Sequence, residues 1–147
     1  MYDHMLLPYD GSTEAKKGAT HGIELAAQLG STVHGLYVID LPGAPRALAL
    51  RDDEEEMRQR YRDYGDEQLA ALADIAADYG VDFESHMRSG SPSAEIVEFA
   101  DEEAMDAIVM GSSYHGKLGS LLGGTTDRVV RSSPVPIIAH RMSVDET

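Results

Sequence analysis

The sequence predicts an α/β fold: a single doubly wound sheet of five parallel strands with helices on both faces. Short apolar segments of strand-like composition alternate with segments whose apolar residues recur at helical spacing, in the order β-α-β-α-β-α-β-loop-α-β. Such alternation implies right-handed crossovers and a parallel sheet. The 147 residues suit one domain. We therefore expect a single domain over residues 1–147, with a polar tail from about residue 142 to residue 147.

The first elements are a strand, a helix and a second strand. An apolar run over residues 5–10 ends in a turn, and Ser12 or Thr13 is suited to cap the helix that follows. Gly30 is placed to end that helix in a left-handed conformation. The segment Thr32–Ile39 is rich in β-branched and aromatic residues, which favours a strand.

A long helical pattern then runs from about residue 47 to residue 79, and residues 81–87 form a third strand. Gly65 is expected to break or kink this helix. The apolar residues of this segment keep mostly to one stripe, which consists of Met57, Tyr61, Tyr64, Leu72, Ile75 and Tyr79.

The last third of the chain begins with a clear helix start, in which Ser91 is the expected cap and Pro92 the first helical residue. The apolar run over residues 107–110 predicts a buried strand, and a glycine-rich loop extends from residue 111 to residue 124. Thr125 or Thr126 is expected to cap a short helix that runs through Arg131, before a final strand over residues 135–140.

Charge and composition exclude several classes of function. The chain has 26 acidic residues, 12 basic residues and a formal net charge of −14, so it lacks the basic face that nucleic acids and anionic membranes require. Such a charge, with three lysines against nine arginines, suggests the hypothesis of a salt-rich cytoplasm in which carboxylate repulsion is screened; the plainer interpretation is a merely acidic, soluble protein. The absence of cysteine excludes disulfides and thiolate metal sites.

The sequence also predicts where the protein acts. Residues 1–4 do not resemble a targeting segment, and no apolar run is long enough to span a bilayer. We therefore expect a cytoplasmic location. The six histidines are scattered without metal-ligand spacing, so no metal site is expected. Ser112, Ser113 and His115 lack the strand-turn-helix elbow of a hydrolase, so no catalytic residue is assigned.

Topology places a candidate site at the carboxyl ends of the strands. In doubly wound sheets ligands bind where the strand order reverses, and Asp10, Asp40 and Gly111 all follow or end predicted strands. The glycine-rich loop before Thr125 has the general design of an anion site, in which backbone N–H groups and a helix dipole hold the charge. The plainer interpretation is a flexible loop followed by a threonine cap. The loop is neither a Walker loop nor a dinucleotide fingerprint.

Over nearly its whole length the chain resembles the universal stress proteins of the UspA type. Five segments carry the resemblance in the expected order: Met5–Ser12, Gly35–Ile39, Gly90–Ile96, Asp106–Gly111 and Gly124–Ile138. The ATP-binding members of that family carry the motif Gly-x2-Gly-x9-Gly-Ser/Thr. Here Gly111, Gly124 and Thr125 keep the spacing, whereas Tyr114 stands in place of the second glycine.

The resemblance implies a binding site for an adenine nucleotide, expected to be ATP, whose phosphates could hold Mg²⁺. The residues that it implicates come from three strand ends and the start of the last helix. Those toward the adenosine are Pro8, Asp10, Val38 and Met110, and those around the ribose and phosphates are Gly111, Ser112, Tyr114, Gly124, Thr125 and Thr126.

Two functions remain open at this point. One is a nucleotide-binding regulatory protein of stress physiology, with slow ATP hydrolysis at most, because the sequence shows no general base directed at water. The other is a nucleotide-free dimeric interaction protein in which Tyr114 blocks the site. An adenylating enzyme of a related fold is disfavoured because its signature motifs are absent. The resemblance further implies a homodimer through the last strand, whose apolar edge favours association.

Overall fold

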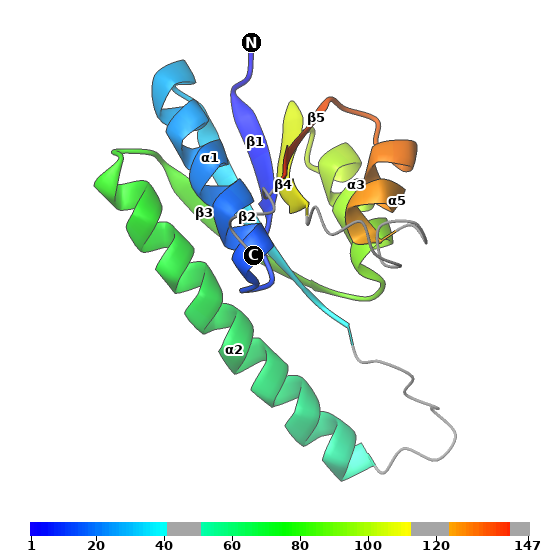
Figure 1. The fold of residues 1–147 in the computed structure, drawn as a ribbon. Helices are drawn as coiled ribbons and strands as arrows, with labels where there is room; N and C mark the ends of the chain where they lie inside the picture. Colours follow the sequence, from blue (N-terminus) through cyan, green and yellow to red (C-terminus); the bar gives the residue numbers. More distant parts are fainter. Residues whose placement is uncertain (41–50, 113–123, 142–147) are drawn as a thin grey trace.

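The computed structural model describes residues 1–40, 51–112 and 124–141, and within them it confirms the predicted α/β fold. Its five parallel strands are ordered β3-β2-β1-β4-β5 (Figure 1). The tail from residue 142 and most of the glycine-rich loop lie outside the described residues. The elements are β1 His4–Pro8, α1 Thr13–Leu29, β2 Thr32–Ile39, α2 Arg51–Asp78, β3 Phe83–Ser89, α3 Pro92–Glu102, β4 Ala107–Ser112, α5 Thr125–Ser132 and β5 Ile137–Arg141.

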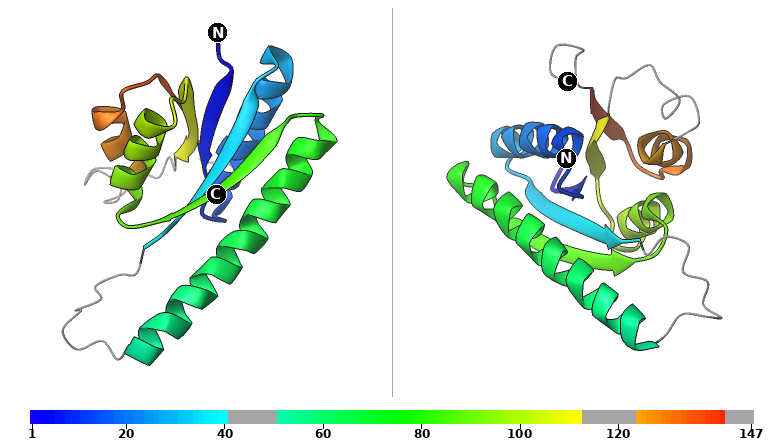
Figure 2. Two further views of the ribbon diagram at one scale, coloured as in Figure 1. Left: turned by 180° about the vertical axis from the view of Figure 1, so that it is seen from behind. Right: turned by 60° about the horizontal axis from the view of Figure 1, so that its bottom comes forward.

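The sheet is covered on both faces. Helices α1 and α2 lie on one face, and α3 and α5 lie on the other (Figures 1 and 2). Strand β1 is central and pairs in parallel with β2 on one side and β4 on the other. The chain thus builds β2 and β3 on one side of β1 and then crosses to β4, so the winding reverses between β1 and β4.

Each face of the sheet has its own hydrophobic core, because alternate residues of a strand point to opposite faces. The core beneath α1 and α2 contains Met5, Leu7, Tyr9, Ala19, Ile23, Ala26, Val33, Leu72, Ala76, Val81 and Val109. The core beneath α3 and α5 contains Leu6, Leu36, Ile96, Phe99, Ala100, Met105, Ile108, Met110 and Val129. The near-continuous apolar runs of β1 and β4 follow from this burial on two sides.

Helix α1 begins and ends as the sequence predicts. The Ser12 hydroxyl accepts a hydrogen bond from the Ala15 N–H at 3.1 Å, which caps the helix. Gly30 adopts φ +73° and ends it in the left-handed region. In α3, by contrast, Ser91 occupies the cap position ahead of Pro92, but its side chain makes no capping hydrogen bond.

The prediction for α2 was partly wrong, because Gly65 does not interrupt the helix. Gly65 is buried, and a Cβ there would come within 2.5 Å of the Tyr37 ring and 2.9 Å of Met87. The missing side chain therefore lets α2 approach β2 and β3 closely.

The predicted apolar stripe of α2 also differs from the buried face. Leu72 is buried, but Met57, Tyr64 and Tyr79 are between 43% and 47% exposed, whereas Leu69 and Ala76 complete the buried face. The first half of α2 projects beyond the sheet (Figure 1), so its apolar residues have less to pack against. The Tyr79 hydroxyl donates a hydrogen bond to Glu24 of α1 at 3.0 Å, which suits a ring with a polar tip at the surface.

Helix α1 and the end of β4 meet at two glycines. A Cβ on Gly18 would overlap the backbone nitrogen of Gly111 and lie 2.7 Å from the Met110 carbonyl carbon. A Cβ on Gly111 would in turn overlap the backbone carbonyl oxygen of Glu14. Backbone atoms cannot move aside as a flexible side chain can, so this contact requires glycine on both elements.

Replacement of Gly18 by alanine tests the contact. We expect Gly18→Ala to lower the free energy of unfolding by about 1–3 kcal/mol through overpacking, despite the better helix propensity of alanine. Gly22→Ala in the same helix is the matched control, because the atoms nearest to its Cβ would be those of the Leu7 side chain, at 3.2 Å, rather than backbone atoms. Urea unfolding followed by circular dichroism measures both, and equal losses in the two variants would contradict the assignment.

Candidate functional site

Three of the predicted site residues lie on one face of three neighbouring strands, at their carboxyl ends. Leu6 pairs with Ile108, so Pro8 and Met110 lie two residues further along β1 and β4 on the same face of the sheet. Val38, near the end of β2, packs against the same core cluster as Met110. Pro8 and Met110 are buried and Val38 is half-buried. The structure thus brings these three residues together at the carboxyl ends of the strands, on the face that carries α3 and α5.

Asp10 follows the end of β1 and is exposed. Its Oδ1 atom accepts a hydrogen bond from the Ser12 N–H at 2.9 Å, which forms an Asx turn before α1. The turn also contains Gly11 at φ +86°, a conformation that favours glycine. Asp10 therefore has a structural role, in addition to any contact with a ligand. It shapes the turn that connects β1 to α1 where the winding reverses, which we call the switch-point turn.

The two ends of the glycine-rich motif are held together by a hydrogen bond. The Thr126 hydroxyl donates to the carbonyl oxygen of Gly111 at 3.1 Å, which joins the first turn of α5 to the end of β4. The prediction that a threonine caps α5 was therefore wrong. Gly124 is the N-cap, and no side chain makes a capping hydrogen bond there. The first N–H groups of α5 are thus left without a side-chain cap, as at helix starts that bind anions.

Helix α2 contributes residues that the sequence did not assign to this edge. A Cβ at Gly11 would come within 2.5 Å of the Tyr64 hydroxyl and 2.9 Å of Gln68, so α2 packs tightly on the switch-point turn. Burial raises the pKa of Tyr9, and the charges of Asp10 and Tyr64 raise it further. The Tyr9 hydroxyl therefore stays protonated at neutral pH. Tyr64 belonged to the predicted apolar stripe, but nothing in the local pattern indicated its contact with the turn.

Two predicted site residues are described only in part or not at all. Ser112 ends β4, where it pairs with Arg141 of β5. Tyr114, which replaces a glycine of the motif, lies outside the described residues. The described part of the site therefore consists of the strand ends and the start of α5.

This geometry defines the class of the protein. It is a doubly wound α/β protein whose winding reverses between β1 and β4, with an uncapped helix start beside the end of β4. The sequence model of the universal stress protein family matches residues 1–141. The chain belongs to the universal stress protein family.

Individual relatives agree with this assignment. A universal stress protein of Methanocaldococcus jannaschii is 31% identical over 141 residues, covering 94% of this chain and 81% of the relative. The solved structure of another protein of that archaeon superposes with a TM-score of 0.80 at 25% identity, covering 97% of this chain and 98% of that one.

Two further solved structures share the fold and contain nucleotides. A universal stress protein in complex with cAMP superposes with a TM-score of 0.75 at 23% identity, covering 97% of this chain and 98% of that one. A family member from Arabidopsis thaliana with AMP bound superposes with a TM-score of 0.74 at 19% identity, covering 99% of this chain and 95% of that one. At these identities the likeness concerns the fold.

The bond between Thr126 and Gly111 can be tested without a ligand. We expect Thr126→Val to lower the free energy of unfolding by about 0.5–1.5 kcal/mol, because it removes a part-buried hydrogen bond while nearly keeping the side-chain shape. Thr125→Val is the matched control, since Thr125 is exposed in the same helical turn. Chemical unfolding measures both variants, and a loss no larger in Thr126→Val than in the control would contradict the role of the bond.

Proposed function

We propose that this protein is a regulatory protein that binds an adenine nucleotide, with ATP the expected ligand, at the carboxyl ends of β1 and β4. The observation that carries the proposal is the hydrogen bond between Thr126 and Gly111, which holds the start of α5 beside the end of β4. An anion placed there would meet uncapped N–H groups and the positive end of the α5 dipole.

The remaining predicted residues divide by their chemistry. Pro8, Val38 and Met110 offer apolar surface on one face of adjacent strands, which suits an adenine ring. The Asp10 carboxylate is exposed at the same edge, where it could accept hydrogen bonds from the ribose hydroxyls. The phosphates would then extend toward Gly124, Thr125 and Thr126. Mg²⁺ would be held mainly by phosphate and water oxygens, as that ion prefers.

The relatives support nucleotide binding over the nucleotide-free alternative. Two proteins of the same fold were crystallised with cAMP and with AMP, respectively. The replacement of a motif glycine by Tyr114 was the feature that favoured a blocked site, and Tyr114 lies outside the described residues. Because relatives of this fold hold nucleotides, binding with this tyrosine in place is the function that we propose.

Titration calorimetry with Mg-ATP tests the proposal on protein dialysed free of small molecules. We expect saturable binding of one nucleotide per chain, and we expect Gly124→Ala to weaken it tenfold or more. Gly124 has an extended backbone, φ −62° and ψ −177°, which alanine adopts without strain, so a loss would reflect the close approach of the ligand. The absence of binding up to millimolar ATP would rule out the proposed function.

Two variants make the result specific. Ser91→Ala changes another helix start that lacks a side-chain capping bond, that of α3, and we expect it to leave binding unchanged. Tyr114→Gly restores the glycine of the family motif and should change the affinity only slightly. If the wild-type protein failed to bind and Tyr114→Gly bound ATP, the nucleotide-free alternative would be correct instead.

We also propose a homodimer through β5. This strand lies at one edge of the sheet and pairs only with β4 among the described residues. The Ile108 N–H donates to the Pro136 carbonyl oxygen, so the parallel register directs the backbone groups of Ile137 and Ala139 toward the edge of the sheet. Unpaired groups in such a row can form a ladder with a second copy of the chain.

Light scattering tests this interface. We expect the wild-type protein to have twice the mass of one chain, and Ala139→Pro to be monomeric, because proline removes an edge N–H without touching the ladder to β4. Ala139→Thr keeps the N–H and should remain dimeric. A monomeric wild-type protein, or a dimeric Ala139→Pro, would contradict the proposal.

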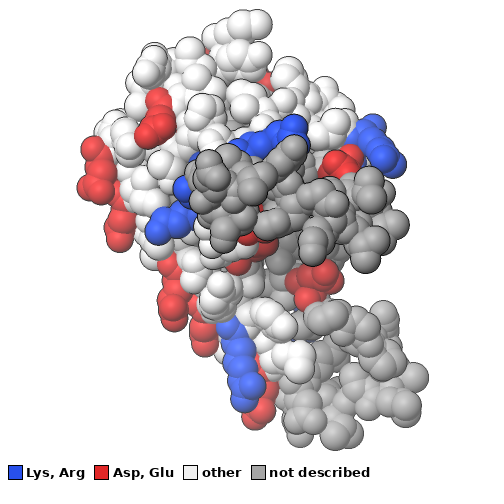
Figure 3. All heavy atoms as spheres, viewed as in Figure 1, with Lys and Arg blue, Asp and Glu red and all other residues white. Residues whose placement is uncertain are grey.

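The proposed setting is a cytoplasm rich in salt. The net charge of −14 produces strong self-repulsion at low ionic strength, and molar salt shortens the screening length to about 3 Å. Figure 3 shows acidic side chains in separate groups, several of them along the left side of the molecule. Among the described residues no helix has the length and apolar character needed to cross a bilayer. Because the charge repulsion depends on salt, the binding and mass measurements are made in parallel at low and at molar salt.

A further inference from the structure

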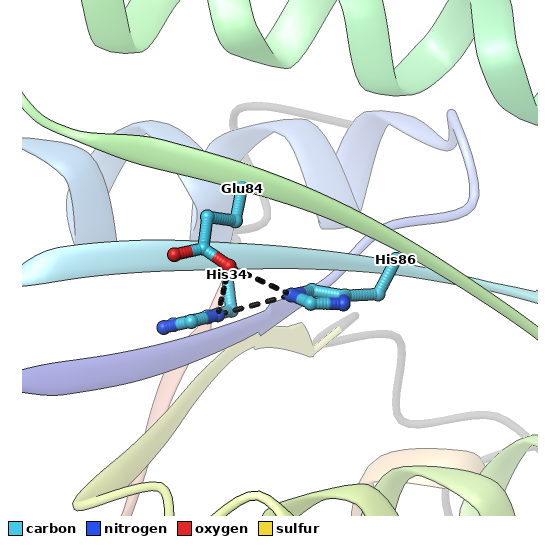
Figure 4. A group of neighbouring side chains, drawn as sticks. All are labelled: His34, Glu84 and His86. Atoms are coloured by element: carbon cyan, nitrogen blue, oxygen red, sulfur yellow. Dashed lines mark hydrogen bonds and ion pairs between the residues drawn. The ribbon is translucent and has the colours of Figure 1, made fainter.

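Three histidines that are far apart in sequence meet at the amino end of the sheet. His4 begins β1, His34 lies near the start of β2 and His86 lies in β3. The parallel register pairs His34 with Glu84 and Leu36 with His86, so Glu84 and His86 point to the same face of the sheet as His34. Figure 4 shows His34, Glu84 and His86 converging. The expectation of scattered histidines therefore does not hold in the folded chain.

The three converging atoms have the spacing of metal ligands. His34 Nδ1 and His86 Nε2 are 3.0 Å apart, and each is 3.9 Å from Glu84 Oε1. The point equidistant from the corners of that triangle is about 2.1 Å from each atom, within the bond lengths of zinc to imidazole nitrogen and carboxylate oxygen. By their distances, one divalent ion could therefore contact all three ligands after the two rings turn toward it.

His4 is placed to orient the His34 ring. For Nδ1 of His34 to bind a metal through its lone pair, the ring must carry its proton on Nε2. That nitrogen is 3.0 Å from Nδ1 of His4, which can accept the hydrogen bond. Histidine ligands commonly donate their second N–H in this way, which fixes the tautomer. With the His34 proton on Nε2, the hydrogen bond between the two rings is donated by His86 Nε2, and the metal would replace that proton.

The surroundings favour a cation that enters from solvent. His34 is buried, the His86 side chain is 26% exposed and the Glu84 side chain is 60% exposed, so the carboxylate side of the group is open to water. Burial lowers the pKa of His34, which favours the neutral ring that a metal needs, and the charges of Glu84 and of Glu103, just after the end of α3, act in the opposite direction. The nearby Arg88 is already paired with Glu102 at 2.8 Å and Glu95 at 3.9 Å. The ligands lie on paired strands, which hold them more precisely than loops would.

We propose that His34, Glu84 and His86 bind one divalent first-row transition-metal ion, with zinc the best match, and that water occupies the remaining coordination positions. Two imidazoles and one carboxylate are a ligand set for zinc and related ions rather than for Ca²⁺ or Mg²⁺, which prefer oxygen alone. The site lies at the amino end of the sheet, opposite the proposed nucleotide edge, and is independent of the proposed function. Because its ligands come from β2 and β3, the ion would cross-link an edge strand to the sheet.

Zinc binding is measured on the full-length chain without a polyhistidine tag. The protein is stripped with EDTA, dialysed into a salt concentration at which circular dichroism shows it folded, and titrated with Zn²⁺. We expect one Zn²⁺ per chain, a rise in the melting temperature, and no comparable effect of Mg²⁺. Co²⁺ held in four-coordinate geometry at the same site should give a visible absorption band much stronger than that of Co²⁺ bound weakly by water and surface carboxylates.

Matched variants assign the ligands. Glu84→Gln and His86→Asn should each weaken zinc binding tenfold or more and abolish the rise in melting temperature. His4→Ala removes only the orienting contact and should weaken binding by about 10–100-fold. Glu98→Gln and His21→Asn are the controls, because they make the same chemical changes at exposed positions outside the group. Both controls should bind like the wild-type protein.

The outcomes separate a built site from adventitious binding. Failure of the folded wild-type protein to take up Zn²⁺ or Co²⁺ would overturn the proposal. Uptake that persists unchanged in both Glu84→Gln and His86→Asn would assign the ion to the acidic surface and would overturn it equally. Glu84 is largely exposed, so its substitution should leave the fold intact and keep this comparison decisive.

Discussion

The close contact between α1 and the end of β4 is the constraint on which the rest of the candidate site depends. Gly18 and Gly111 have no side chains to separate their backbones, so the helix and the strand end lie together. The Gly111 carbonyl in turn accepts the Thr126 hydrogen bond that positions α5. A glycine that the motif assigned to ribose and phosphates thus also has a packing role, and the position of the helix start follows from it.

The two ends of the sheet differ in electrostatic character because of the winding. In a doubly wound fold every helix runs antiparallel to the strands, so helix N-termini gather at the carboxyl ends of the strands and helix C-termini gather at the amino ends. The start of α5 accordingly offers N–H groups where we propose that phosphates bind. At the opposite end, Glu103 follows α3 near the histidine group, where we propose that a cation binds. The same winding therefore suits an anionic ligand at the carboxyl ends of the strands and a cation at their amino ends.

Local signals predicted the elements well and their contacts less well. The Ser12 cap and the Gly30 stop of α1 depend on neighbouring residues only, and the structure confirms both. Gly65 was interpreted by its low helix propensity, but in the structure α2 continues through it because the missing Cβ admits Tyr37. Thr126 was expected to cap α5, yet its hydroxyl bonds to a residue fifteen positions earlier. In each failure a tertiary contact outweighed a local preference.

The sequence by itself determined the fold class, the order of the elements and the edge of the sheet where a nucleotide site is expected, because periodicity and turn residues are local properties of the chain. It could not reveal the meeting of His34, Glu84 and His86. Their spacing depends on the register between β2 and β3, which pairs residues about fifty positions apart. Strand register is set by how the whole sheet packs, so only the tertiary structure decided that these side chains would share one site.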